Sequence, residues 1–109
     1  MIISRTPVRT SIIGGSSDVI PSILRRYGLV LGCTIQQYSY ITVRYLPKYF
    51  DYNNRLSYSE IETTNSIEEI KHKVIRAAIR YLELENVEVC HSGDVPSFSG
   101  LGSSSCFLV

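Results

Sequence analysis

Pro96-Ser-Phe-Ser-Gly-Leu-Gly-Ser-Ser-Ser105 is a glycine- and serine-rich loop that runs directly into the apolar residues Cys106 to Val109. Its two glycines let the backbone approach a bulky anion closely, and its serines offer hydroxyl and N–H groups at a predicted helix start. A helix N-terminus presents unpaired N–H donors and the positive end of the helix dipole. The loop is therefore predicted to bind a phosphate group, with a nucleotide as the first ligand to test.

Several other uses of such a loop are disfavoured by its residues. A Walker-type loop has a Lys after its last glycine, whereas Ser103 follows Gly102. A dinucleotide-binding fingerprint has a third glycine, which is missing here. The chain has no Gly-x-Ser-x-Gly elbow of the α/β-hydrolases. The alternative to phosphate binding is a flexible loop that leads into a serine-capped helix.

Runs of β-branched and aromatic residues punctuated by turn residues predict the strands that precede this loop. Pro7 within the first run indicates an edge strand or two short strands with a bend. The run from Arg55 to Glu62 is the weakest pattern and suits an exposed edge strand. The predicted strands are Ile2 to Ile13, Leu29 to Ile35, Tyr38 to Leu46, Arg55 to Glu62 and Val87 to His91.

One long helix is predicted between the last two strands. Ser66-Ile-Glu-Glu69 matches a capping box, and the helix is expected to end near Leu84. A shorter helix is predicted over Val19 to Tyr27. The fold class is therefore α+β, a mostly antiparallel sheet with one long helix packed on it. The apolar stripe that predicts the long helix consists of Ile67, Ile70, Val74, Ala77 and Tyr81.

Composition narrows the kind of protein. The 109 residues are enough for one domain, and the net charge of +1 provides no electrostatic footprint for nucleic acid or an anionic membrane. The three cysteines fit neither a disulfide framework nor a paired zinc spacing. No signal peptide or run of about 18 apolar residues is present. We therefore expect a cytoplasmic protein whose partner is a small molecule.

The loop resembles the second motif of the GHMP kinase superfamily, which includes galactokinase, homoserine kinase, mevalonate kinase and phosphomevalonate kinase. The pattern of that motif is Pro-x-x-x-Gly-Leu-Gly-Ser-Ser-Ser. Every fixed position is matched, by Pro96, Gly100, Leu101, Gly102, Ser103, Ser104 and Ser105.

A second signature lies where that superfamily places its first motif. Arg5-Thr-Pro-Val-Arg9 and Gly14-Gly-Ser-Ser-Asp18 resemble the Arg-x-Pro-x-Arg and Gly-Gly-Gly-Thr-Asp patterns of the branch that includes D-glycero-D-manno-heptose 7-phosphate kinase. Ser16 and Ser17 depart from these patterns, although both are small. Tyr40 to Pro47 is also similar to that branch, so the resemblance covers nearly the whole chain. A bacterial heptose kinase is therefore the first choice of relative, and a fucokinase-like sugar kinase is the second.

The resemblance implies the fold of the N-terminal GHMP kinase domain, which is ribosomal protein S5 domain 2-like. It also implies that Gly100 to Ser105 wraps the phosphates of ATP through backbone N–H groups, with a hydroxyl of Ser104 or Ser105 toward Mg²⁺. Helix capping is the alternative role of these serines. The implied partners are ATP and a sugar phosphate, with no nucleic acid and no membrane.

The first motif implies the sugar side of the site. Gly14, Gly15 and Asp18 match residues that hold sugar hydroxyls, and an Asx-turn is the alternative use of Asp18. Arg9 matches an arginine near the transferred phosphoryl group, where a fixed cation stabilises developing charge. A solvated strand arginine is its alternative role.

The function implied by the resemblance is phosphorylation of the anomeric hydroxyl of a heptose 7-phosphate by ATP. The family's catalytic aspartate, its acidic metal ligand and its third motif all follow the second motif. We therefore expect residues 1–109 to be an N-terminal ATP-binding fragment that is inactive alone and lacks the C-terminal domain. A non-catalytic remnant that serves as a binding or interaction module is the alternative from a different functional class.

Overall fold

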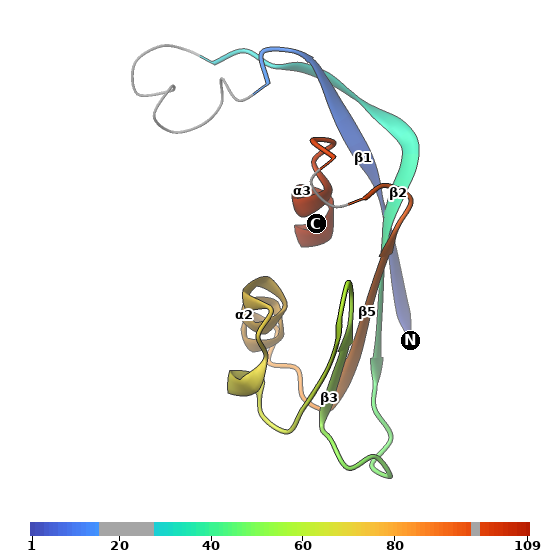
Figure 1. Cartoon of the computed structure of the whole chain (residues 1–109), viewed down its shortest axis with the longest axis vertical. Coiled ribbons are helices and arrows are strands. Elements are labelled where there is room, and N and C mark those ends of the chain that lie inside the picture. Colours follow the sequence, from blue (N-terminus) through green and yellow to red (C-terminus); the bar gives the residue numbers. More distant parts are fainter. Residues whose placement is uncertain (16–27, 97–98) are drawn as a thin grey trace. The chain divides into compact units, whose positions relative to one another are not determined.

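The structure is a computed structural model that describes residues 1–15, 28–96 and 99–109. The described elements combine one five-stranded sheet, in the order β1-β2-β5-β3-β4, with short helices (Figure 1). This confirms the α+β class, whereas the predicted helix over Val19 to Tyr27 lies outside the described residues. In chain order the elements are β1 (Ile2–Ile13), β2 (Leu31–Tyr45), β3 (Asn54–Ser57), β4 (Ile61–Thr64), the 3₁₀ helix η1 (Ile67–Glu69), α2 (Lys73–Tyr81), β5 (Val87–Gly93) and α3 (Ser103–Leu108).

The chain divides into two units, which are described separately below. Unit 1 consists mainly of Met1–Arg5 and Tyr40–Ser92, and unit 2 mainly of Thr6–Ser39 and Gly93–Phe107. Strands β1, β2 and β5 contribute residues to both units. The hairpin β3–β4 and helices η1 and α2 belong to unit 1, whereas nearly all of α3 belongs to unit 2.

The strands differ from the sequence prediction in two places. β1 is one continuous edge strand, as Pro7 allows, because an edge strand needs no hydrogen bond from every residue. The two neighbouring strands predicted over 29–35 and 38–46 are wrong, since β2 runs unbroken from Leu31 to Tyr45. Gln36 and Gln37 lie within that strand and are exposed, and no glycine or proline interrupts it there. Two exposed polar residues therefore continued the strand instead of ending it.

The weak strand predicted over Arg55 to Glu62 is a hairpin. β3 pairs antiparallel with β4, with Leu56 opposite Glu62, and pairs in parallel with β5, with Leu56 beside Val89. The Tyr58 N–H donates to the Glu60 carbonyl at 2.9 Å and closes the turn. The sheet is therefore mixed at this side, and β4 forms its second edge.

The long helix predicted from Ser66 to Leu84 is wrong. Ser66 Oγ accepts from the Glu68 N–H, but this cap opens only the single turn of η1. Ile70 then has extended backbone (ψ 118°), which ends the turn. The nine-residue helix α2 starts afterwards, at the cap provided by His72 Nδ1, which accepts from the Ile75 N–H.

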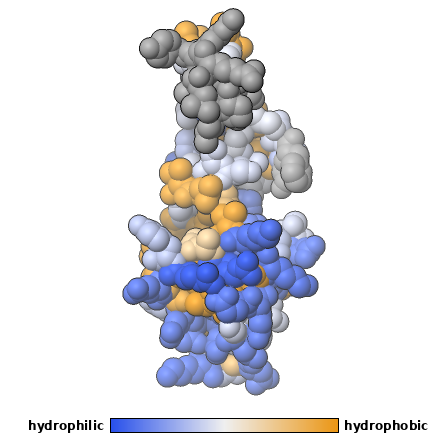
Figure 2. Space-filling view, turned by 90° about the vertical axis from the view of Figure 1, so that its left-hand side faces the viewer, coloured by the Kyte–Doolittle hydropathy of each residue, from blue (hydrophilic) through white to orange (hydrophobic). Residues whose placement is uncertain are grey.

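The later start changes which face of the helix is buried. Ile75 and Ile79 are 3% and 2% exposed, whereas Tyr81, which the predicted stripe included, is 84% exposed. Leu56, Ile70 and Val87 complete the most deeply buried part of unit 1. Helix α2 lies on one side of the sheet (Figure 1). The outer face of η1 and α2 is hydrophilic (Figure 2) and carries the exposed side chains of Glu68, Glu69, Lys71, Lys73 and Arg80.

Two buried carboxylates of unit 1 have strong partners. Glu88 is 5% exposed and accepts from Arg44 and from Arg55 Nη1, the latter at 2.6 Å. Burial alone would raise the pKa of Glu88, but the two arginines outweigh it and lower the pKa below its ordinary value. Glu62 has a lowered pKa for a similar reason, because hydrogen bonds from the Tyr58 hydroxyl and the Lys71 N–H outweigh its burial. The same Tyr58–Glu62 hydrogen bond raises the pKa of Tyr58 to about 12.

These lowered pKa values predict acid sensitivity of unit 1. A carboxyl whose pKa is lower in the folded state stabilises the protein above its ordinary pKa of 4.5, and that stabilisation is lost as the pH falls through the folded value. We expect the urea midpoint to fall with pH below about 4.5. Glu88→Gln should lower the urea midpoint at pH 7, and the midpoint of this variant should fall less steeply with pH than that of the parent. Glu60→Gln, at an exposed site of the hairpin, is the control, and an acid slope in Glu88→Gln as steep as in the parent would contradict the assignment.

Among the described residues, no helix is long and apolar enough to cross a membrane.

Candidate functional site

The two sequence motifs meet in unit 2. The backbone N–H of Arg9, on β1, donates to the carbonyl oxygen of Leu101, in the glycine-serine loop, at 3.2 Å. A Cβ added to Gly102 would lie 3.4 Å from Cγ of Arg9, so the second glycine of the loop packs against the Arg9 side chain. The Arg9 guanidinium also donates to the Ser11 hydroxyl on the same strand. The structure thus brings together the predicted catalytic and nucleotide-binding residues.

The loop has the backbone conformation that its glycines favour. Gly100 and Gly102 have φ values of +75° and +71°, a region that is costly for residues with a Cβ. A Cβ added to Gly100 would meet no atom of the described residues within 4 Å, so one side of the loop is open. Such a loop can bring its backbone close to a ligand.

Helix α3 begins where the sequence predicts it. Ser103, Ser104 and Ser105 form its first turn, and Gly102 is the N-cap, without a side-chain hydrogen bond to the turn among the described residues. The hydroxyls of Ser104 and Ser105 belong to exposed residues. The predicted alternative role of these serines, capping by a side chain at the N-cap position, is therefore not the one seen, because a glycine occupies that position.

Cys106 anchors α3 to the first motif. Its thiol is buried and donates to the carbonyl oxygen of Pro7 at 3.3 Å.

Pro96, the first fixed residue of the loop motif, is exposed and precedes residues 97 and 98, which lie outside the described part of the chain. On the other side of the loop, Asp94 Oδ2 accepts from the Tyr38 N–H at 2.8 Å. Both ends of the motif are therefore tied to strands of unit 2.

The sugar-side residues are described only in part. Gly14 follows β1 with φ +75°, and a Cβ there would lie 1.9 Å from the carbonyl oxygen of Leu29. Gly15 follows it in a turn, and Asp18 lies outside the described residues. Gly14 is thus required by both backbone conformation and space, which accounts for a glycine at this position independently of any ligand.

A shallow pocket beside Arg9 was not predicted. It has a volume of about 380 Å³ and is lined by Arg9, Val30, Gly32, Cys33 and Thr34, all in unit 2. Gly32 lets β1 and β2 approach, because its Cβ would lie 2.7 Å from the Thr10 carbonyl oxygen. A glycine within a strand is the sequence signal for such an approach, and it was available at Gly32.

The described residues supply no ready-made acidic metal centre. Within residues 1–15, 28–96 and 99–109, no three His, Cys, Asp or Glu side chains gather as a metal site would require. All three cysteines are free thiols, and Cys33 is exposed. The exposed residues Ser104 and Ser105 of α3 carry hydroxyl oxygens at the end of the loop.

No protein-family profile matches the chain. No curated protein matches it either.

Solved structures do match. A D-glycero-D-manno-heptose 1-phosphate kinase from Bacteriodes thetaiotaomicron is 26% identical with a TM-score of 0.80, and the match covers 99% of this chain and 40% of that one. A mevalonate kinase is 17% identical with a TM-score of 0.71, over 99% of this chain and 37% of that one. The chain thus spans about two fifths of the length of either kinase. Both neighbours are GHMP kinases, and the chain has the fold of their N-terminal part, which confirms the resemblance indicated by its two motifs.

Proposed function

We propose that this chain is the N-terminal, nucleotide-binding part of a GHMP-type sugar kinase. The observation that carries the proposal is the hydrogen bond from the Arg9 N–H to the Leu101 carbonyl oxygen, because it joins two motifs that are distant in sequence. The likeness to a heptose-phosphate kinase supports the same assignment. The whole enzyme would transfer a phosphoryl group from ATP to the anomeric hydroxyl of a heptose 7-phosphate.

The loop fits the phosphates of ATP. The open side at Gly100 leaves room for a bulky anion, and the first-turn N–H groups of α3 are available because Gly102 offers no capping side chain. Ser103 to Ser105 would donate these N–H groups to phosphate oxygens. ATP would supply the transferable phosphoryl group, and the loop would hold and orient it.

Mg²⁺ would be held partly by a hydroxyl of Ser104 or Ser105. Both residues are exposed in the first turn of α3, so a hydroxyl of either would be free to hold Mg²⁺, which would supply charge neutralisation to the phosphates. The resemblance to GHMP kinases implies that an acidic ligand would come from a later part of the enzyme. This is consistent with our proposal that residues 1–109 bind the nucleotide but do not complete the catalytic site.

The sugar would bind beside Arg9. The guanidinium lies on β1 next to Gly102, and the pocket lined by Val30, Cys33 and Thr34 adjoins it. Gly14, Gly15 and Asp18 would contribute the hydroxyl contacts that the first motif implies. Arg9 would then stand between phosphate and sugar, where its charge stabilises the transferring group.

Nucleotide binding can be tested on the chain itself. We expect MgATP to bind in isothermal titration calorimetry, and Gly102→Ala to weaken the binding by about tenfold, because a Cβ at a φ of +71° strains the backbone of the loop. Gly93→Ala is the matched control, since its Cβ meets only ordinary contacts, the nearest at 3.6 Å. Absence of MgATP binding in a folded chain would overturn the assignment of the loop.

Catalysis needs a second measurement. We expect no ADP release by residues 1–109 with heptose 7-phosphate, and ADP release together with a new anomeric phosphate signal in ³¹P NMR when the longest reading frame containing them is assayed. Fucose in place of heptose 7-phosphate distinguishes the fucokinase-like alternative. Nucleotide binding without turnover in the longer protein, with either sugar, would favour a non-catalytic binding module.

A further inference from the structure

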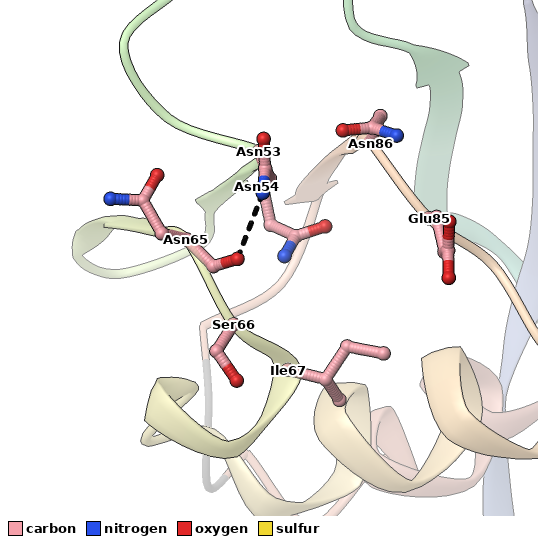
Figure 3. A pocket seen from close by; sticks show the side chains of 7 residues that line it. All are labelled: Asn53, Asn54, Asn65, Ser66, Ile67, Glu85 and Asn86. Atoms are coloured by element: carbon pink, nitrogen blue, oxygen red, sulfur yellow. Dashed lines mark hydrogen bonds between the residues drawn. The ribbon is translucent and has the colours of Figure 1, made fainter.

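A polar cavity of about 300 Å³ opens in unit 1 (Figure 3). Its walls come from the start of β3, the turn between β4 and η1, and the loop between α2 and β5. All four asparagines of the chain line it. The lining residues are Asn53, Asn54, Asn65, Ser66, Ile67, Glu85 and Asn86.

Local structure explains two of these asparagines. Asn53 Nδ2 donates to the Asn65 carbonyl oxygen at 2.9 Å and holds the two strand ends together. Asn86 has a φ of +54°, a left-handed conformation that asparagine tolerates better than most residues. Its carbonyl oxygen also accepts from the Leu46 N–H at 2.6 Å. Both residues therefore have a structural role apart from any ligand.

Asn54 has no such explanation. Its side chain is buried, with the residue 3% exposed, and Oδ1 has no hydrogen-bond partner among the described residues. Thr64, its cross-strand partner in the hairpin, is 8% exposed, and its Oγ1 is likewise without a partner within the described part of the chain. A buried polar atom without a partner destabilises a fold, so its presence calls for a reason. Figure 3 shows the Asn54 amide pointing into the space bordered by Ile67, Glu85 and Asn86.

The lining selects a class of ligand. Each amide offers both a donor and an acceptor, as a hydroxyl group does, so the cavity matches a ligand with several hydroxyls. No Lys or Arg is among the seven lining residues, which disfavours a phosphate, and no aromatic ring is there to stack on a nucleobase. Glu85 is the single carboxylate, too few for a divalent cation. The volume lies at the small end of ligand pockets.

We propose that this cavity is a binding site for a small neutral polyol, a monosaccharide or a cyclitol, with Asn54 as a principal hydrogen-bonding residue. The Asn54 amide would donate to and accept from adjacent hydroxyls of the ligand, and Ile67 would pack against its C–H groups. The inference does not rest on the kinase proposal, because every lining residue belongs to unit 1 and the glycine-serine loop belongs to unit 2.

The asparagine content of the chain makes the test selective. In ¹⁵N-labelled protein every asparagine side-chain NH₂ signal reports on this cavity, whereas Gln36 and Gln37, the chain's two glutamines, lie exposed on β2 in unit 2. We expect titration with methyl α-D-glucopyranoside or myo-inositol to shift the asparagine signals saturably and to leave the glutamine signals unchanged. Inorganic phosphate should shift none of them. The inference is overturned if neither polyol produces a saturable shift, or if glutamine signals move equally.

A pair of variants tests the role of Asn54. Asn54→Ala removes the amide. It should lower the affinity for whichever of the two polyols binds by about tenfold. Thr63→Ala, at an exposed position of β4, is the control and should bind as the parent does. If Asn54→Ala does not fold, Asn54→Ser serves instead, because it also removes the amide but leaves a small polar group at the buried position. Unchanged affinity in whichever of these two variants folds would contradict the assignment.

Discussion

For the kinase proposed above, Arg9→Ala is expected to lower kcat/KM by about 10²–10³-fold, because the proposal assigns to Arg9 the fixed positive charge that stabilises the transferring group. The Arg9 side chain is exposed on β1, and its hydrogen bond to Ser11 is local to that strand. The backbone N–H that bonds Leu101 is retained in the variant. The loop should therefore keep its position, and MgATP affinity should change much less than kcat.

Steady-state kinetics measures the change in kcat, and calorimetry measures the change in MgATP affinity. Arg80→Ala is the charge-matched control, since Arg80 pairs only with the exposed Glu68 at 2.5 Å among its described ion-pair partners. Arg9→Lys keeps the charge but not the planar geometry and should recover part of the activity. Equal losses of kcat/KM in Arg9→Ala and Arg80→Ala would remove Arg9 from the site.

The second large effect concerns stability. Leu56→Ala is expected to destabilise the fold by about 2–5 kcal/mol, because Leu56 is fully buried where β3 pairs with β4 and β5. That cost is comparable with the whole stability of a marginal domain, about 5–15 kcal/mol. A large fall in the urea midpoint follows, with partial unfolding at room temperature if the parent lies at the low end of that range.

Ile61→Ala provides the comparison for Leu56→Ala within the same hairpin. Ile61 lies one position from the Leu56–Glu62 pair and is 66% exposed, so its truncation should change stability by less than about 0.5 kcal/mol. Urea denaturation followed by circular dichroism measures both. A Leu56→Ala effect no larger than that of Ile61→Ala would show that β3 is not the centre of the core of unit 1.

The backbone conformation of the glycine-serine loop was the most predictable part of the molecule. Gly100, Gly102 and the serines of α3 act through backbone conformation, which is a local property, so their spacing in sequence carries the information. The serines from Ser103 to Ser105 were predicted to open a helix, and α3 begins there. The α+β class also followed from local patterns, since the β-rich runs fell on the observed strands even where one run was split or two strands were joined.

The errors arose where distant contacts outweighed local patterns. The Ser66 capping signal is real, since Ser66 accepts from Glu68, but Ile70 adopts an extended conformation and is fully buried. The extended backbone that buries Ile70 therefore prevents the helix that starts at Ser66 from continuing into α2. The pocket beside Arg9 and the asparagine-lined cavity were not predicted, because each is assembled from segments that are separate in sequence.

The sequence by itself indicated the features that depend on neighbouring residues: the turn-forming glycines of the glycine-serine loop, the helix that follows the loop, and the motifs that resemble those of GHMP kinases. Only the tertiary structure decided that Leu101 bonds to Arg9, that Glu88 lies between two arginines, and that Asn54 Oδ1 is buried without a partner among the described residues. The physical reason is that the conformational preference of a turn or cap depends on a few adjacent residues. Burial, ion pairing and cavity formation depend instead on which distant strands the fold brings into contact.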